Sequence, residues 1–339
     1  MTDILNKHHE MLMNNLPVQN ITGDVFGRTC GPLGFGCAWL GRAGGKDTAV
    51  RLLHAAHDAG ITYFDTARLY GDGVAEGCLA EAFASRRDKV VITTKVGILP
   101  PPNGLGIRIT EKLAHLARKA PPARKLIAQP KLREPVFGVF DLQRMRASVE
   151  TSLRELRTDH VDCLLLHECT LADATNPDVI GFVEGLQREG KIRAWGVAPT
   201  VRDMLAIAHS GAGFGQVAQF ANSAFNDTLA KVGKPAGAVR ITHSSLADGF
   251  RSLLETLKSA DAAIRWRAAT GSDPSDHAML GRLFLRYALQ RNEGGIVLFS
   301  TSQPARIADN VRVIQPNDAE REMADRLPAG LRAVAEPAP

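Results

Sequence analysis

Eight short, β-prone apolar runs alternate along the chain with longer segments of helical periodicity, and this repeat limits the fold more than any other feature. Runs that are apolar throughout and separated by helices are typical of a parallel sheet that is buried on both faces. Eight such units are the number found in a (β/α)8 barrel, which is therefore the predicted fold. The runs are residues 32–39, 61–67, 89–96, 161–168, 192–199, 215–222, 239–246 and 295–302.

A doubly wound open sheet is the alternative fold for such an alternating chain. A dinucleotide-binding sheet would carry a GxGxxG motif directly after its first strand. The nearest match, formed by Gly71, Gly73 and Gly77, has one residue too many before the last glycine. The barrel is favoured, and we expect a single barrel domain over residues 1–339. The helix candidates are residues 47–60, 142–156, 177–190, 276–290 and 304–314.

The composition narrows the class of protein without identifying it. Apolar residues make up 45% and charged residues 23%, an ordinary globular composition, and no apolar run approaches the ~20 residues of a membrane span. The N-terminus lacks the pattern of a secretory signal. The five cysteines lie far apart with no CxxC pair, which favours a reducing compartment. We therefore expect a cytoplasmic protein with no membrane partner, and the sequence gives no reason to expect a metal site.

The net charge of +5 is concentrated in one segment. Residues 98–135 contain eight Lys or Arg and two Glu, so their positive excess is larger than that of the whole chain. Such a local feature is no argument for nucleic acid binding. The segment belongs to a longer stretch, 98–141, that follows a strand end and exceeds an ordinary strand–helix connection. We expect an insertion on the catalytic face: a lid over the substrate, a docking surface for a partner or acidic lipid, or a solvated insertion with one helix on the barrel rim.

Reactive side chains follow the second, third and fourth expected strands. Asp65 ends the second strand with Tyr70 just beyond it, Lys95 ends the third and His167 ends the fourth. In a barrel, functional residues gather at these carboxyl ends. Taken singly, the four could be a helix cap, a packed phenol, a snorkelling lysine and a core histidine. As a set they are stronger evidence for a functional site, because an ammonium at the end of a buried strand needs a carboxylate and Asp65 is the available partner of Lys95.

Four collinear motifs resemble those of the aldo-keto reductases, NAD(P)H-dependent carbonyl reductases built on a (β/α)8 barrel. The motifs are FDTARLYGDGVAEGCLAEAF (64–83), ITTKVG (92–97), LRTDHVDCLLLHE (156–168) and GKIRAWGV (190–197). The resemblance runs from about Leu33 to Asn310, interrupted by the basic segment. It implies that Asp65, Tyr70, Lys95 and His167 are the catalytic residues.

The chemistry of these four residues fits carbonyl reduction, which needs a hydride from the nicotinamide and a proton for the developing alkoxide. Tyr70 would donate the proton, Lys95 would lower the pKa of the phenol, and Asp65 would hold Lys95 in place. His167 would orient the substrate oxygen. Two alternatives remain open: a non-catalytic NADP(H)-binding barrel, and an aldolase that forms a Schiff base on Lys95.

The expected cofactor site lies in the loops after the seventh and eighth strands, residues 243–246 and 300–310. The resemblance places Ser302, Arg306 and Asn310 at the adenosine end, where a guanidinium suits a 2′-phosphate and favours NADPH, with NADH possible. It also shows three departures: Ala198-Pro199 where Ser-Asn is common, His243 where a stacking Tyr is common, and Ser300 where Lys is common. The expected cofactor-binding residues are Gln219, Asn222, His243, Ser244, Leu246, Ser302, Arg306 and Asn310. Sugars, pyridoxal-like aldehydes and bulky alicyclic ketones all remain open as substrates.

Overall fold

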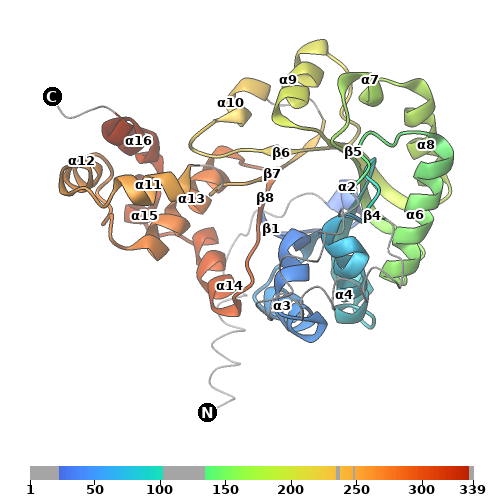
Figure 1. Cartoon of the computed structure of the whole chain (residues 1–339), viewed down its shortest axis with the longest axis horizontal. Helices are drawn as coiled ribbons and strands as arrows, with labels where there is room; N and C mark the ends of the chain where they lie inside the picture. Colours follow the sequence, from blue (N-terminus) through green and yellow to red (C-terminus); the bar gives the residue numbers. More distant parts are fainter. Residues whose placement is uncertain (1–22, 102–133, 234–236, 247–248, 336–339) are drawn as a thin grey trace, which may run out of the picture.

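The computed structural model describes residues 23–101, 134–233, 237–246 and 249–335 (Figure 1). Eight parallel strands close into a barrel in chain order, with β1 hydrogen-bonded to both β2 and β8. The predicted (β/α)8 barrel is therefore confirmed, and each expected apolar run contains one strand. The strands are β1 (Leu33–Gly36), β2 (Tyr63–Asp65), β3 (Val91–Val96), β4 (Val161–His167), β5 (Ile192–Ala198), β6 (Val217–Ala221), β7 (Val239–His243) and β8 (Ile296–Phe299).

Side chains alternate between the two faces of each strand, and this alternation produces two separate apolar layers. One cluster fills the inside of the barrel, with Tyr63, Val91 and Leu165 among its members. A second cluster, which includes Phe64, Ile92 and Leu164, packs between the strands and the surrounding helices. Because both faces are covered, the strands are apolar throughout, as their sequence indicates.

The five helices expected from the sequence are present, with ends that follow local capping. The side chain of Asp141 accepts a hydrogen bond from Arg144 N at the start of α6. Asn176 caps α8, which begins with Pro177. Residues 312–314, expected to extend the last of these helices, form a 3-10 turn instead. The five are α3 (Lys46–Asp58), α6 (Leu142–Leu156), α8 (Pro177–Arg188), α13 (His277–Arg291) and α14 (Pro304–Val311).

Further helices complete the described structure. Among the described residues, none of the helices has the length and apolar character that a membrane crossing requires. The additional α-helices are α2 (Gly23–Phe26), α4 (Val74–Ala82), α7 (Leu171–Ala174), α9 (Val201–Ser210), α10 (Thr228–Val232), α11 (Phe250–Thr256), α12 (Ala260–Thr270), α15 (Asp318–Asp325) and α16 (Leu327–Ala335), and the 3-10 helices are η1 (Cys37–Arg42), η2 (Tyr70–Gly73), η3 (Arg87–Lys89) and η5 (Arg312–Ile314).

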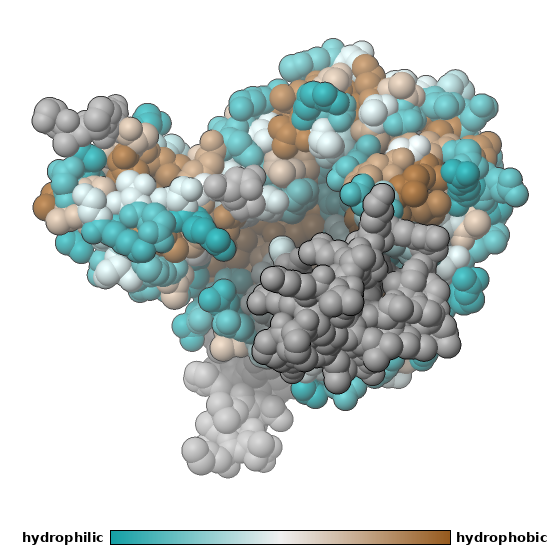
Figure 2. All heavy atoms as spheres, viewed as in Figure 1, coloured by the Kyte–Doolittle hydropathy of each residue, from teal (hydrophilic) through white to brown (hydrophobic). Residues whose placement is uncertain are grey.

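A helical lobe formed by α11, α12, α15 and α16 lies at one side of the barrel (Figure 1). Its core is a separate apolar cluster in which Trp266 of α12 and Leu327 of α16 are fully buried together with Phe284 of α13. Residues from the β7–α13 connection thus pack against residues that follow β8. Figure 2 shows a hollow with apolar surface between this lobe and the rest of the molecule.

A buried carboxylate holds several elements together near the amino-terminal end of β4. Asp162 is fully buried, and its Oδ2 accepts hydrogen bonds from Arg87 Nη2 and Ile92 N, both at 2.8 Å. Arg28 Nε and Arg193 Nε lie 3.7 Å and 3.3 Å from Oδ1. One buried anion therefore serves three guanidinium groups from different parts of the chain.

The described ends of the basic insertion lie side by side. Leu99 and Val136 form an antiparallel bridge, with both backbone hydrogen bonds present. Residues 102–133 lie outside the described residues, and with them most of the segment expected to be a lid, a docking surface or a solvated insertion.

Candidate active site

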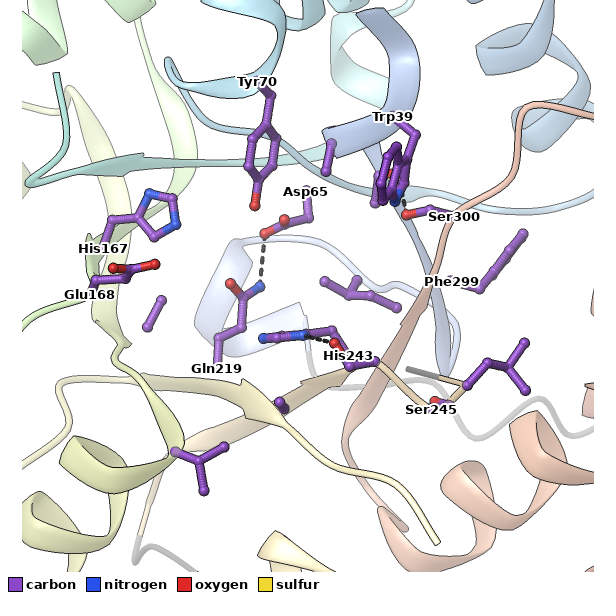
Figure 3. Close-up of a pocket in the computed structure, with 18 of the residues that line it drawn as sticks. Trp39, Asp65, Tyr70, His167, Glu168, Gln219, His243, Ser245, Phe299 and Ser300 are labelled. Carbon is purple, nitrogen blue, oxygen red and sulfur yellow. Dashed lines mark hydrogen bonds between the residues drawn. The ribbon is translucent and has the colours of Figure 1, made fainter. Parts of the chain in front are cut away.

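The last inward-facing residue of several strands is polar, and together these residues form one layer at the carboxyl end of the barrel. Along β3, Val91 belongs to the interior cluster, and by alternation Thr93 and then Lys95 face the same way. The same count leads from Tyr63 to Asp65 and from Leu165 to His167. It also leads to His243 at the end of β7 and to Gln219 on β6, where Ala221 follows as the last inward-facing residue. Strand register thus brings side chains that are far apart in sequence to one level (Figure 3).

Lys95 and Asp65 form a buried ion pair at the centre of this layer. Both residues are only 3% exposed. Lys95 Nζ donates to Asp65 Oδ1 at 2.6 Å, to Asp65 Oδ2 at 2.7 Å and to the Thr66 carbonyl oxygen at 2.9 Å. Burial lowers the pKa of Lys95, but Asp65 and Tyr70 outweigh it and the net pKa is raised. The lysine is therefore an ammonium, and Asp65 is its counter-ion rather than a helix cap.

Tyr70 begins η2 just beyond β2 and leans over the ion pair. Lys95 Nζ lies 5.1 Å from the centre of the phenol ring. Gly71, with φ 60°, turns the chain sharply after it, in a region that glycine enters without cost. The sequence led us to expect a lowered phenol pKa. Burial instead raises the pKa of Tyr70, and Lys95 opposes this rise without cancelling it, so the phenol is protonated at neutral pH.

His167 lies beside Tyr70, with its ring edge-to-face to the phenol at a centroid distance of 6.2 Å and an angle of 89°. Burial, the Lys95 charge and His243 together lower the pKa of His167 to about 3. A neutral imidazole has one donor and one acceptor nitrogen, so it can donate to a carbonyl oxygen without carrying charge.

His243 is the second neutral imidazole of the layer. Burial and Lys95 lower its pKa to about 4, although Asp65 opposes the shift. Its Nδ1 lies 2.8 Å from the hydroxyl of Ser244, which follows β7 with a φ of 66°. The short hydroxyl contact fixes the orientation of the ring at the cavity wall (Figure 3).

The two residues expected to contact a nicotinamide carboxamide differ in placement. Gln219 lines the cavity and donates through Nε2 to Asp65 Oδ2 at 2.8 Å, so it also braces the ion pair. Asn222 is fully buried and does not line the cavity; its Oδ1 accepts a hydrogen bond from Leu229 N at the start of α10. Its Nδ2 has no hydrogen-bond partner among the described residues.

These residues open onto a cavity of about 640 Å³. Of the residues expected from the sequence, Lys95 is buried beneath this cavity. Ser302 and Arg306 are exposed at the start of the α14 region and are not part of the cavity wall. The expected residues that do line it are Asp65, Tyr70, His167, Gln219, His243, Ser244, Leu246 and Asn310.

The cavity wall also contains residues that the sequence did not single out, among them Trp39, Ser245 and Glu168. Trp39, 49% exposed, comes from η1 and lies near Ser300 (Figure 3). Ser245 is 5% exposed, and its hydroxyl has no hydrogen-bond partner within the described part of the chain. The sequence could have indicated this residue, because it lies between Ser244 and Leu246, which were both expected to bind the cofactor.

Glu168 is the third of these residues. It directly follows His167 and has a φ of 49°, in the left-handed region that costs a residue with a side chain about 1–2 kcal/mol. In the sequence it is the last residue of the expected run 161–168, and no local pattern marks its backbone conformation.

Comparison with known proteins agrees with this geometry. A D-threo-aldose 1-dehydrogenase from Pseudomonas sp is 32% identical over 184 residues, which are 52% of this chain and 52% of that protein. The chain thus spans about half the length of this curated relative. A solved glycerol dehydrogenase from Gluconobacter oxydans has the same fold, with a TM-score of 0.65 and 21% identity over 96% of this chain and 98% of that one.

A second solved relative, an aldo-keto reductase from Klebsiella pneumoniae in complex with NADPH, is similar with a TM-score of 0.56 and 21% identity, over 91% of this chain and 95% of that one. The family model described as Aldo/keto reductase family matches residues 32–327, which is most of the chain. The chain therefore belongs to the aldo/keto reductase family.

Proposed function

We propose that this protein is an NADPH-dependent reductase that converts an aldehyde or ketone to an alcohol, or catalyses the reverse oxidation. One observation carries the proposal: the phenol of Tyr70 borders the same cavity as His167, with the buried Asp65–Lys95 pair directly behind it. This arrangement combines a proton donor, a neutral hydrogen-bond donor and a fixed positive charge around the place where a carbonyl oxygen would lie.

The residues have distinct roles in the proposed reaction. The nicotinamide would supply the hydride that adds to the carbonyl carbon while the π electrons move to the oxygen. His167 orients that oxygen by donating a hydrogen bond to it. Tyr70 transfers its phenol proton to the same oxygen, and the Lys95 ammonium stabilises the phenolate that remains. Asp65 and Gln219 keep the ammonium in place.

The residues around the cavity fit a nicotinamide cofactor. Ser245 Oγ, which belongs to the cavity wall, has no hydrogen-bond partner in the described structure. Buried polar atoms of this kind are normally paired, so this hydroxyl is a candidate contact for the cofactor. The exposed Arg306 in α14 is a candidate partner of a 2′-phosphate, which is the basis for proposing NADPH as the cofactor.

The geometry does not favour the two alternative functions. A Schiff-base aldolase needs an unprotonated lysine amine, whereas the raised pKa of Lys95 and its three hydrogen bonds keep it as an ammonium. A binding module without catalysis would not need the aligned Tyr70, Lys95 and His167. All five cysteines are buried and none of them forms a disulfide, which supports our expectation of a reducing compartment such as the cytoplasm.

The test is Tyr70→Phe, with NADPH oxidation followed at 340 nm over a panel of aldehydes and ketones. We expect kcat to fall by about 10²- to 10⁴-fold, the range of general acid catalysis, while NADPH still quenches tryptophan fluorescence with a similar Kd. Tyr287→Phe makes the same chemical change in α13, outside the cavity, and should leave kcat at the wild-type level. Wild-type turnover by the Tyr70 variant would refute the role of the phenol. NADPH binding without turnover of any carbonyl by the wild type would favour the binding module.

A further inference from the structure

The cavity has one carboxylate that the proposed reaction does not use. Glu168 lines the wall beside His167, and its carboxylate has no hydrogen bond or ion pair among the described residues. Its backbone is well held: Glu168 N donates to the Ala198 carbonyl oxygen at 2.8 Å, and the next residue, Cys169, is fully buried. The side chain therefore starts from a fixed point and extends into open space in the cavity.

The side of the cavity on which Glu168 lies is not the side expected to bind the cofactor. In Figure 3, His167 and Glu168 lie at one side, Ser245 and Phe299 lie at the other, and Tyr70 and Asp65 lie between them. A carboxylate would repel the phosphates of a dinucleotide. The distance of Glu168 from the loop at Ser245 therefore agrees with binding of the cofactor phosphates near that loop. Glu168 is thus placed to meet the substrate.

The charges around the cavity select among substrates. No Lys or Arg occurs among the described residues of its wall, and Asp65 is neutralised by Lys95 from below. His167 and His243 are neutral. Glu168 is therefore the only uncompensated charge on this wall within the described part of the chain, and it is negative. A substrate with a carboxylate or phosphate group would be repelled.

We propose that Glu168 is a specificity-determining residue that binds hydroxyl groups of a neutral, polyhydroxylated carbonyl substrate, and that it selects against anionic carbonyl compounds. A carboxylate has two oxygens that can accept from two neighbouring hydroxyls at once. Apart from Asp65, which Lys95 neutralises, no second carboxylate lines the wall in the described structure, which suits hydroxyls better than an ammonium. This inference rests on the proposed reductase function and names its substrate class.

The backbone at Glu168 supports the proposal independently. Its positive φ would be relieved by glycine, which enters this region without steric cost. A residue with a charged side chain at such a position is maintained against the local conformational preference, and such positions cluster at ligand-binding sites. We therefore attribute the glutamate at this position to the role of its side chain, because glycine would form the same turn with less strain.

The test compares Glu168→Gln with the wild type on three aldehydes: glyceraldehyde (two hydroxyls), propanal (none) and succinic semialdehyde (one carboxylate). We expect the ratio of kcat/KM for glyceraldehyde over propanal to fall about 10- to 100-fold in the variant, because a charged hydrogen-bond acceptor is lost. This corresponds to about 1.4–2.8 kcal/mol. The ratio for succinic semialdehyde over propanal should rise, which a merely structural effect would not produce.

Two more variants separate the side chain from the backbone. Glu168→Gly should raise Tm or leave it unchanged while the glyceraldehyde ratio falls as in Glu168→Gln. Arg157→Gly relieves a similar positive φ of 52° at the end of α6, and it should leave both ratios at the wild-type values.

The outcomes are distinguishable. Unchanged ratios in Glu168→Gln, with propanal still reduced, would overturn the role of Glu168 and leave the reductase function standing. A fall in turnover of 3-aminopropanal but not of glyceraldehyde would overturn the assignment to hydroxyl groups in favour of an ammonium site. Absence of turnover of every carbonyl by the wild type would overturn both proposals.

Discussion

Replacing Asp65 by asparagine should destabilise the protein by about 3–5 kcal/mol at neutral pH, because the Lys95 ammonium would be buried without a counter-ion. The structure sets the scale. Lys95 is 3% exposed, and both carboxylate oxygens lie within 2.7 Å of its Nζ. The loss has an upper limit, since the lysine can release its proton on folding. At pH 7 that release costs about 4.6 kcal/mol, from an unfolded pKa of about 10.4 and 1.36 kcal/mol per unit.

The pH dependence makes this prediction specific. In the wild type the pKa of Lys95 is raised, so the stabilisation by the pair is present below about pH 10.4 and is lost only as the pH rises through the folded pKa. In Asp65→Asn, the largest influence that opposes the effect of burial on the pKa of Lys95 is lost, so this pKa is lowered. At pH 9 the limiting cost is only about 1.9 kcal/mol. The difference in stability between variant and wild type should therefore shrink as the pH rises from 7 to 9.

Urea unfolding, followed by tryptophan fluorescence at pH 7 and pH 9, measures these free energies. The matched controls are Lys95→Met and the double variant Asp65→Asn/Lys95→Met. The double variant should recover most of the stability lost in Asp65→Asn, because a neutral pair leaves no buried charge. A loss below about 1 kcal/mol at pH 7, or a loss that does not change with pH, would refute the argument that the pair is buried and ionised.

Three further predictions concern proton transfer, the cofactor and the base of the barrel. The kcat of reduction should be constant from pH 6 to 8 and should decrease at high pH as Tyr70 ionises, whereas the kcat of oxidation should increase there. Profiles of kcat against pH in both directions measure this. A step in either profile near pH 6.5 would contradict the lowered pKa values of His167 and His243. Arg306→Ala should raise the KM for NADPH more than that for NADH, and equal effects would remove Arg306 from 2′-phosphate recognition. Asp162→Asn should lower the free energy of unfolding, measured with urea, by about 3–5 kcal/mol, because three arginines lose their shared anion. The kcat of the folded enzyme should stay unchanged, and a lowered kcat would show that this network affects the active site.

The sequence predicted the barrel correctly, and it pointed to residues that the structure brings together at one end of the barrel, for a common reason. Strands that are apolar on both faces are visible as runs, and a polar residue at the end of such a run stands out. Asp65, Lys95 and His167 were found in this way, and Tyr70 was found by its distance from Asp65. The bounds of the five expected helices were also close, because Asp141, Pro177 and similar capping residues mark them.

The remaining features depend on contacts that a linear pattern does not contain. The helical lobe was missed because α12 buries only Ala262, Trp266 and Thr270, and its partner α16 lies far along the chain. Asn222 was expected in the cavity, but its side chain caps α10 instead. The net pKa of Tyr70 could not be predicted, since it depends on how far burial outweighs the Lys95 charge. Glu168 was missed because a backbone angle, rather than a sequence pattern, distinguishes it.

Three of the four proposed catalytic residues lie within strands, and this has a consequence for how such an enzyme could change. Asp65, Lys95 and His167 are held by the hydrogen-bond register of a closed sheet, so a one-residue insertion within β4 would turn His167 away from the barrel interior. Glu168 and Trp39 lie just beyond strands, so a substitution of either side chain leaves this register intact. Under the proposed function, such substitutions would change which carbonyl compound is accepted without disturbing the transfer of the proton. Evolution or a designer can therefore retune selectivity one rim residue at a time, and the most economical starting position is the one directly after His167.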